Sequence, residues 1–539
     1  MLSRDSNIEM YDANIREKKR GVIVAALLAA LITAIVYLPA LKNGFVTWDD
    51  NEYVYNNLKI GNLDTEFVRW AFTTPQVGMY SPLTLLSLGL DFFLWDLKPS
   101  GYHLTNVGLH VLNTFLVVLC IARILQAASQ AGYLRPFSPR RMLITAEVTG
   151  LLFGIHPLHV ESVAWVSERK DVLYTFFFLL SVLSYLRYAA INKRAVPFYS
   201  MALLTFVLSL LSKPMAVTLP AVLIILDVYP LNRLSFSNGL APVKKVILEK
   251  LPFLGLSMVF SVVAVRAQQT VNAMAPAEFG ALERLLTAAR AMFFYLQKFL
   301  LPVYLSPFYP LFLPISFTTT DVAVLLVLFG ITFFCAKAWR KNRIWMIIWV
   351  YYLVSVLPVS GILQVGSQAA ADRYAYMPLI GPMVMVGAGV AHLAERIGIH
   401  ARSRKFGLKL LIAGLVVLSV SMVAITEKQI RVWQDGLTLW RRVFDVYPDG
   451  TYAAYLGRAE AYYRAGIFSK AVADYTEAIR LDPSSYGSYC TRGIIYFLTG
   501  RNDLALNDFN RTLSIKPGDT EAIYYKSLIC QGNKSPACK

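Results

Sequence analysis

The sequence predicts an all-α protein, a polytopic membrane helical bundle followed by a C-terminal α-solenoid. Hydrophobic residues make up 56% of the 539 residues and charged residues only 16%, whereas about 25% of an ordinary soluble domain is charged. Apolar runs long enough to cross a bilayer alternate with short basic loops, which is typical of polytopic helical membrane proteins. The C-terminal part contains an internal repeat with a period of 34 residues, which is typical of a helical repeat solenoid.

The membrane part is expected at 21–426, after a cytoplasmic tail at 1–20. We interpret the first apolar run as a retained span, because no small-residue cleavage site followed by a soluble domain is seen. The first outer loop, 41–100, is long, and its apolar stretch 81–97, interrupted by Asp91, is expected to lie on the membrane as an interfacial helix. Run length and hydropathy predict about eleven spans, at 21–40, 101–125, 142–160, 171–190, 197–212, 214–230, 247–265, 321–337, 344–360, 377–393 and 407–426.

One segment, 285–304, is apolar enough to span but carries Arg290, Gln297 and Lys298. If it does not span, the basic loop residues all fall on the cytoplasmic side, as such residues usually do. We therefore expect 285–304 to be re-entrant or interfacial, and the C-terminal domain to be extracytoplasmic. The basic loop residues in question are Arg135, Arg140, Arg141, Lys193, Arg194, Lys244, Lys245, Lys337, Arg340, Lys341, Arg343, Arg402, Arg404 and Lys405.

The C-terminal domain, 427–539, contains an internal repeat in which Arg458 corresponds to Arg492 and Asp474 to Asp508. The Gly, Ala, Asp-aromatic and Pro positions follow in the same order in both copies, and this period and order are those of tetratricopeptide repeats. A half unit is expected before the two repeats, at 440–448, and a solvating helix after them, at 521–530. The net charge of +18 lies mostly in the short loops of the membrane part, where it orients the protein, so no nucleic-acid partner is expected.

An acidic pair, Asp49-Asp50, follows the first apolar run. Carboxylates near lipid are costly and usually functional, so both residues are candidate catalytic groups. Either carboxylate could take the proton of an acceptor hydroxyl or polarise it through a metal. The alternative is a solvated loop or a helix N-cap.

The predicted topology places further polar residues on the same outer side as the acidic pair. Cations there would stabilise the charge that develops on a phosphate leaving group, and a lipid-linked phosphosugar has its phosphate at that depth. The candidate donor phosphate-binding residues are Arg169, Lys170, Lys213 and Arg373. The further active-site candidates are His103, Asn106, His156, His159, Glu161, Glu168 and Asp372.

Each of these residues also has a structural interpretation. The run His156-x-x-His159-x-Glu161 could bind a divalent metal or be a hydrogen-bonded pair at a helix end. Lys213 could snorkel between two apolar runs, and Arg373 could anchor the membrane interface. The cluster of Glu168, Arg169 and Lys170 could anchor a span, and His103 and Asn106 could stabilise a helix start.

These runs resemble a known family, the transmembrane and tetratricopeptide repeat-containing O-mannosyltransferases and their bacterial relatives, within the GT-C class of lipid-phosphosugar glycosyltransferases. The resemblance covers about 40–539, and the histidine run and the order of the motifs are its most specific features. The matching segments are the acidic pair with Asn56-Asn57, then 101–107 with His110, 152–163, 211–213 and 372–378.

The resemblance implies a GT-C fold and an inverting transfer of a sugar from a dolichyl- or undecaprenyl-phosphate type donor to a hydroxyl of a protein or glycan. Asp49 or Asp50 would lie near the acceptor. Apart from the resemblance, the carboxylates and histidines named above could hold a divalent metal as a cofactor. The small number of repeats suggests a bacterial version, in the inner membrane with its repeats in the periplasm. A eukaryotic version would have them in the ER lumen.

Two other functional classes were weighed. A non-catalytic membrane scaffold whose repeats recruit envelope proteins is favoured by the repeats, which usually bind peptides. It is disfavoured by the outer polar clusters, because an anchor needs one span and no buried charges. A transporter would show internal repeats among its spans, and none is seen.

Overall fold

The computed structural model describes residues 2–61, 63–132, 138–191, 195–234, 240–270, 280–399 and 404–531. The chain divides into two compact units. The first unit holds Met1–Gly44, Asp50–Leu305 and Leu311–Arg431, and the second holds Phe45–Asp49, Ser306–Pro310 and Val432–Lys539. Each unit is described by itself.

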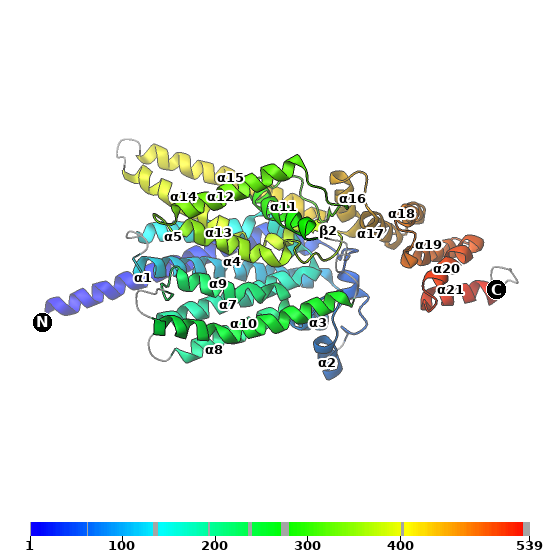
Figure 1. The fold of residues 1–539 in the computed structure, drawn as a ribbon, viewed down its shortest axis with the longest axis horizontal. Helices are drawn as coiled ribbons and strands as arrows, with labels where there is room; N and C mark the ends of the chain where they lie inside the picture. The colour runs from blue at the N-terminus through cyan, green and yellow to red at the C-terminus, as the bar shows by residue number, and fades with distance from the viewer. Residues whose placement is uncertain are drawn as a thin grey trace. The chain divides into compact units, whose positions relative to one another are not determined.

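Long helices form most of the first unit (Figure 1). Its main helices are α1 (Leu2–Tyr37), α4 (Pro99–Gln130), α5 (Pro139–Ile155), α7 (Arg169–Ala190), α8 (Val196–Ser212), α9 (Leu219–Val228), α10 (Leu240–Gln269), α11 (Ala281–Leu300), α12 (Thr319–Ala338), α13 (Ile344–Val356), α14 (Ile380–Ile399) and α15 (Arg404–Val432). All eleven predicted apolar runs are therefore helical. Helices α1, α4, α5, α7 and α14 form the interior, since α4 packs against α1, α5 and α7, and α14 packs against α5.

Short elements connect these helices. Those of the first outer loop are η1 (Leu38–Lys42), η2 (Asn51–Tyr55), α2 (Thr65–Thr73) and α3 (Pro82–Trp95). Those farther along the chain are η3 (Pro157–His159), α6 (Val160–Ala164), η4 (Val166–Glu168), η5 (Pro214–Thr218), η7 (Leu357–Val359), η8 (Asp372–Ala375) and the strands β1 (Tyr309–Pro310) and β2 (Gln368–Ala370). The predicted interfacial stretch 81–97 forms α3.

Six helices of the described chain are long and apolar enough to cross a membrane, and a seventh results if the bent pair Pro139–Ile155 and Pro157–Ala164 counts as one span. Four shorter apolar helices accompany them, Pro82–Trp95, Val196–Ser212, Pro214–Val228 and Ile344–Val359. The number of eleven spans thus remains a prediction. The basic loop residues Arg135, Lys193, Arg194 and Arg402, on which the predicted orientation partly depends, lie outside the described residues.

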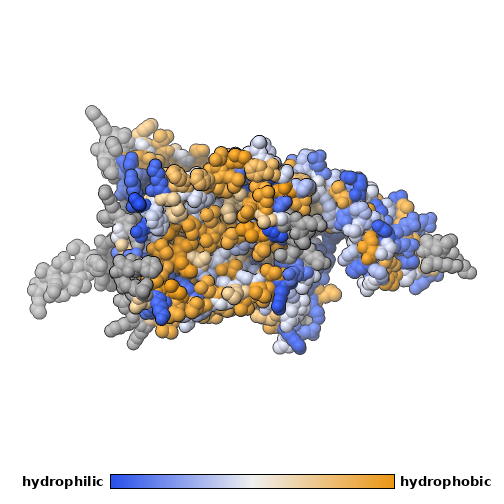
Figure 2. Space-filling view, viewed as in Figure 1, coloured by the Kyte–Doolittle hydropathy of each residue, from blue (hydrophilic) through white to orange (hydrophobic). Residues whose placement is uncertain are grey.

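The peripheral helices of the first unit expose apolar side chains. Only 6% of the most apolar window of α15 is buried, against 56% for α4. Figure 2 shows hydrophobic residues over much of the visible face of this unit, whereas the second unit shows a mixture of hydrophilic and hydrophobic residues. An apolar exterior of this kind requires a hydrocarbon surrounding, so the first unit is an integral membrane domain.

The second unit is built mainly from helix pairs, α17 (Tyr452–Arg464) with α18 (Phe468–Leu481) and α19 (Tyr486–Leu498) with α20 (Asn502–Ile515). Helix α16 (Gly436–Val446) precedes them and α21 (Thr520–Gln531) follows. These two helices correspond to the half unit and the solvating helix that the sequence predicts. Gly466 and Gly500 turn the chain within the pairs at φ 70° and 75°, a left-handed conformation that glycine adopts without steric cost.

Candidate active site

Asp50 is the residue of the acidic pair that belongs to the membrane domain. It directly precedes η2 and is only 1% exposed. Its Oδ1 atom accepts hydrogen bonds from the backbone N–H of Ser167, at 3.0 Å, and from the Ser167 hydroxyl. These bonds fix the carboxylate against η4.

Asp49 belongs to the second unit, in the segment Phe45–Asp49. Its φ angle is 49°, which lies in the left-handed region that few residues other than Gly, Asn and Asp adopt. The acidic pair is therefore divided between the two units, so Asp49 and Asp50 do not have equivalent surroundings.

Three of the predicted phosphate-binding cations share one carboxylate. The Oε2 atom of Glu168 lies 3.0 Å from Lys213 Nζ, and its Oε1 atom lies 3.5 Å from both Lys170 Nζ and Arg373 Nε. All four side chains are at most 8% exposed. Buried charges require such pairing, because an isolated ion in a low-dielectric interior is very costly.

Two further carboxylates complete this ion cluster, which we define as Glu161, Glu168, Lys170, Asp171, Lys213 and Arg373. Lys213 Nζ lies 2.7 Å from Asp171 Oδ1, while the guanidinium of Arg373 pairs with Glu161. The backbone N–H of Arg373 also donates to Glu161 Oε2 at 3.2 Å.

Aromatic rings line the cationic side of the ion cluster. The guanidinium carbon of Arg373 lies 4.9 Å from the ring centroid of Tyr374 and 5.3 Å from that of Trp165. Lys170 Nζ lies 4.5 Å above the ring of Tyr53. Such ring faces attract cations, so they help to hold Lys170 and Arg373 beside Glu168.

A break in the helix that runs through 139–190 brings these groups together. Helix α5 ends at Ile155, and the next segment, Pro157–Ala164, is bent from it by 53°. The short η3, α6 and η4 precede α7. The Asn106 amide donates to the carbonyls of Val163, at 3.2 Å, and Trp165, at 3.0 Å. Non-helical backbone at membrane depth needs this kind of internal partner, so Asn106 stabilises the break rather than the start of its own helix.

Arg169 differs from the other predicted cations, because protein groups occupy its guanidinium. It is 0% exposed and pairs with Asp91 at 2.5 Å. It also donates to the Ser87 hydroxyl at 2.7 Å, to the Tyr102 carbonyl at 2.9 Å and to Asn106 Oδ1. With donors committed to four groups, Arg169 fixes the start of α7 between α3 and α4.

Among the described residues, the histidines of the candidate set do not form a metal site. The Nε2–H of His156 donates to the Phe299 carbonyl at 3.1 Å, and its Nδ1 accepts from the Leu158 N–H at 3.3 Å. Glu161 is committed to Arg373. Within the described residues no group of three His, Cys, Asp or Glu side chains is placed to hold a metal ion. The metal interpretation of His156, His159 and Glu161 is thus not supported, and His156 is a structural residue at the end of α5.

The remaining candidates lie buried near these groups. His159 donates from Nδ1 to the Phe153 carbonyl at 2.7 Å, and its Nε2 has no hydrogen-bond partner. His103 Nε2 lies 3.3 Å from the Gly44 carbonyl. Asp372 is 3% exposed at the first position of η8, directly before Arg373.

The sequence analysis did not assign roles to Asp91 and Asp171, which the structure shows to be ion-pair partners of Arg169 and Lys213. A signal existed for both. Asp91 is an isolated carboxylate in an apolar stretch, and Asp171 closes the charged run 168–171. Tyr53 had no comparable signal, because an aromatic residue in a loop is ordinary.

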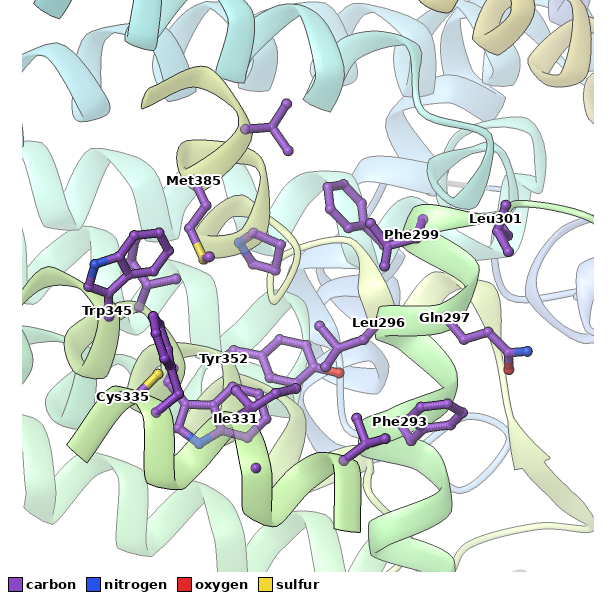
Figure 3. Close-up of a pocket in the computed structure, with 18 residues that line it drawn as sticks. Phe293, Leu296, Gln297, Phe299, Leu301, Ile331, Cys335, Trp345, Tyr352 and Met385 are labelled. Atoms are coloured by element: carbon purple, nitrogen blue, oxygen red, sulfur yellow. The ribbon is translucent and has the colours of Figure 1, made fainter. Parts of the chain in front are cut away.

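An apolar cavity of about 650 Å³ lies between α11, α12, α13 and α14 (Figure 3). Phe293, Leu296, Ile331 and Tyr352 are among its lining residues, and Gln297 is the one with an amide. The backbone carbonyl of Phe299, another lining residue, accepts the hydrogen bond from His156 described above. The cavity is therefore joined through α11 to the broken segment that carries the ion cluster.

A family model for the tetratricopeptide repeat matches residues 452–485. A protein O-mannosyl-transferase of Caenorhabditis elegans is 24% identical over 488 residues, which cover 88% of this chain and 65% of the relative. Drosophila melanogaster Tmtc1 is 35% identical over 29% of this chain and 17% of its own length, and human TMTC4 is 34% identical over 28% and 22%. The chain thus spans less than two thirds of the length of these relatives.

Among solved structures, that of ArnT from Cupriavidus metallidurans bound to undecaprenyl phosphate matches 78% of this chain and 77% of that one, at 13% identity and a TM-score of 0.35. The Caenorhabditis elegans match extends over most of the chain, and the repeat match lies where the period of 34 residues is found. The chain is therefore similar in sequence to proteins named protein O-mannosyl-transferases.

Proposed function

We propose that this protein is a membrane glycosyltransferase that moves a sugar from a polyprenyl-phosphate donor to a hydroxyl of a protein or glycan acceptor. Its relatives are named protein O-mannosyl-transferases. The observation that carries the proposal is the ion cluster. Lys170, Lys213 and Arg373 share Glu168, and Asp50 is bound to the adjacent Ser167.

The shared pairing suits a phosphate leaving group. When the bond between the sugar carbon and the phosphate oxygen breaks, negative charge grows on the phosphate, and preorganised cations stabilise that charge most strongly where water is excluded. Contacts of 3.5 Å from Glu168 to Lys170 and Arg373 are long for charge-assisted hydrogen bonds. A phosphate oxygen can therefore replace them without breaking a short bond.

The acceptor needs a base. In the proposed reaction a carboxylate of the acidic pair takes the proton of the acceptor hydroxyl as its oxygen bonds to the sugar carbon, and the polyprenyl phosphate leaves. Asp50 is the carboxylate that belongs to the same unit as the ion cluster. An ionised carboxylate has about four acceptor positions, so a carboxylate that accepts from Ser167 can also accept from a hydroxyl.

The apolar cavity suits the donor's isoprenoid chain. Its lining side chains are nearly all apolar or aromatic, and burying such a chain gains roughly 25 cal/mol per Å² removed from water. We place the reaction on the extracytoplasmic side, with the repeats assisting acceptor recognition, because the basic loops orient the chain in that way.

The test uses full-length protein in detergent with two donors, dolichyl-phosphate mannose and undecaprenyl-phosphate mannose, and a denatured protein extract as acceptor. Wild type should release polyprenyl phosphate and label protein, and Asp50→Asn should lower the rate about 100-fold or more with an unchanged unfolding temperature. Gly330→Phe would fill the cavity, since a Cβ at Gly330 meets no atom within 4 Å, and should raise KM for the donor. Absence of release with both donors would favour a non-catalytic scaffold.

A further inference from the structure

The second compact unit contains more than the repeats. It includes the segment Phe45–Asp49, which ends on the first residue of the acidic pair. Within this unit the ring of Trp48 lies 5.4 Å from that of Trp440 in α16 and 6.0 Å from that of Phe308, measured between centroids. Aromatic rings at such separations attract one another beyond the area they bury. The residue directly before Asp49 is thus held by the half repeat.

Trp440 is itself fixed by the first full repeat. It is 3% exposed, and a Cβ built on Gly457 of α17 would lie 2.0 Å from the Trp440 ring. The ring therefore lies flat against the α17 backbone, where only glycine leaves room. A Cβ on Gly436, the first residue of α16, would lie 2.3 Å from the Thr47 hydroxyl. Helix α16 thus approaches the same segment at a second point.

The second unit reaches the acidic pair through the backbone. Trp48, packed against Trp440 and Phe308, is joined by one peptide bond to Asp49, which belongs to the same unit. Asp49 has φ 49°, a left-handed conformation that asparagine and aspartate adopt more readily than most other residues. The packing of Trp48 therefore bears directly on the backbone of Asp49.

From this geometry we infer that Trp48 and Trp440 form a clamp by which the second unit fixes the segment 45–49, and with it the backbone of Asp49, the first carboxylate of the acidic pair. The inference rests on the proposed function for its catalytic part, although the clamp itself does not. Trp48 and Trp440 are positioning residues, which act through the backbone of Asp49. In the proposed reaction the repeats thereby have a second role, beside acceptor recognition, in setting the conformation of Asp49.

The first test measures the clamp without reference to activity. Hydrogen–deuterium exchange of the full-length protein follows the peptide that covers 45–50, because exchange reports local opening. Trp440→Ala and Trp48→Ala should each speed that exchange on the order of tenfold, and the double variant should add little to either. Trp440→Phe and Trp48→Phe, which keep a ring, should stay close to wild type. Tyr524→Ala, at a 58% exposed position of α21, is the matched control.

The second test uses the transfer assay with dolichyl-phosphate mannose. Loss of the clamp should lower kcat by about 100-fold, the size of effect that a displacement of about 1 Å produces, while KM for the donor stays within about twofold because the ion cluster is untouched. The phenylalanine variants should restore kcat.

Unchanged exchange at 45–50 in Trp48→Ala would overturn the clamp, and this variant lies outside the repeat helices, so it avoids unfolding them. Faster exchange with unchanged kcat would overturn the positioning role. If the wild type itself releases no polyprenyl phosphate, the proposed function fails, while faster exchange in the variants would still support the clamp.

Discussion

In the repeat domain each structural arginine has one carboxylate to itself, whereas in the membrane domain three cations share the carboxylate of Glu168. Arg458 makes a two-point bond to Asp474, at 2.7 and 2.8 Å, and Arg492 makes the same bond to Asp508, at 2.8 Å for both contacts. Glu168 contacts its three cations at 3.0 to 3.5 Å.

This difference in pairing distinguishes two kinds of ion pair between a cation and a carboxylate. A bidentate arginine–carboxylate pair satisfies both groups in one geometry and resists exchange. A carboxylate spread over three cations binds each of them less completely, which in the proposed function allows the donor phosphate to take its place. Arg169 shows that location alone does not decide the use, because it lies beside the ion cluster but is saturated as the repeat arginines are.

The largest expected effect distinguishes two buried lysines of the membrane domain. Lys213 pairs with Glu168 and Asp171, and Lys250 pairs with Asp227 at 2.5 Å in a second network. Lys213→Met removes the cation that lies 2.7 Å from the buried Asp171, so it should destabilise the protein by about 3–5 kcal/mol. Lys250→Met leaves Asp227 paired with Arg233 at 3.1 Å, so it should cost less. Only Lys213→Met should also lower transfer about 100-fold or more, measured at a temperature where both variants are folded. Equal losses of activity would make Lys213 structural.

The next effect tests whether Arg169 is a structural residue. Arg169→Met should destabilise the membrane domain by about 3–5 kcal/mol, because Asp91 would be left buried and unpaired. The double variant Arg169→Met/Asp91→Leu should regain much of that loss, and KM for the donor should change little in either. Unfolding in detergent and donor KM are the measurements. A stable Arg169→Met variant with a donor KM raised tenfold would return Arg169 to the phosphate-binding set.

A smaller effect is expected in the repeats. The Arg458 side chain is 23% exposed, so solvent weakens its pair, and Arg458→Met should lower the stability of the repeat domain by about 1 kcal/mol. Arg492→Met, at 15% exposure, should cost slightly more. Exchange protection of α17 to α20 in the full-length protein measures both. A cost equal to that of Lys213→Met would contradict the distinction between the two regions.

The smallest effect concerns Cys490 in α19. Burial, together with the nearby carboxylate of Asp519, raises the pKa of the Cys490 thiol to about 12. Only about one molecule in ten thousand then carries the reactive thiolate at pH 8. Iodoacetamide should leave Cys490 unmodified in the native protein and modify it in urea, as mass spectrometry of the peptide would show. Rapid native labelling would indicate that the repeat interior opens.

Much of the architecture could be predicted from local signals. Apolar run length located the helices of the membrane domain, since length and composition alone decide whether a run can be a buried or lipid-facing helix. The period of 34 residues located α17 to α20, because each repeat carries its own turn glycine and its own Arg–Asp pair. The number of membrane spans is harder to predict from the sequence. The helix Val196–Ser212 is short, and the pair at 139–164 is bent, so length and composition do not decide whether each of them spans.

The site was predicted less completely. Six polar residues are predicted on one side, and the structure joins them by hydrogen bonds and ion pairs within two short networks. They are Asp50, Glu161, Glu168, Lys170, Lys213 and Arg373. Arg169 is predicted among the phosphate-binding cations, and a metal is one of two alternatives for the run of His156, His159 and Glu161. The structure commits Arg169 and His156 to other protein groups. The sequence identifies a charged residue but does not show whether its partner is a ligand or another side chain such as Asp91.

The sequence by itself determined the membrane bundle, the repeats and the chemical types present at the site, because hydropathy and periodicity are properties of contiguous residues. Only the tertiary structure decided which cation is shared and which is saturated, and that Trp48 packs against Trp440, 392 positions later in the chain by the numbering of the two residues. Those outcomes depend on which buried groups meet across the fold. Pairing energies and desolvation costs act between neighbours in space, which the order of residues along the chain does not specify.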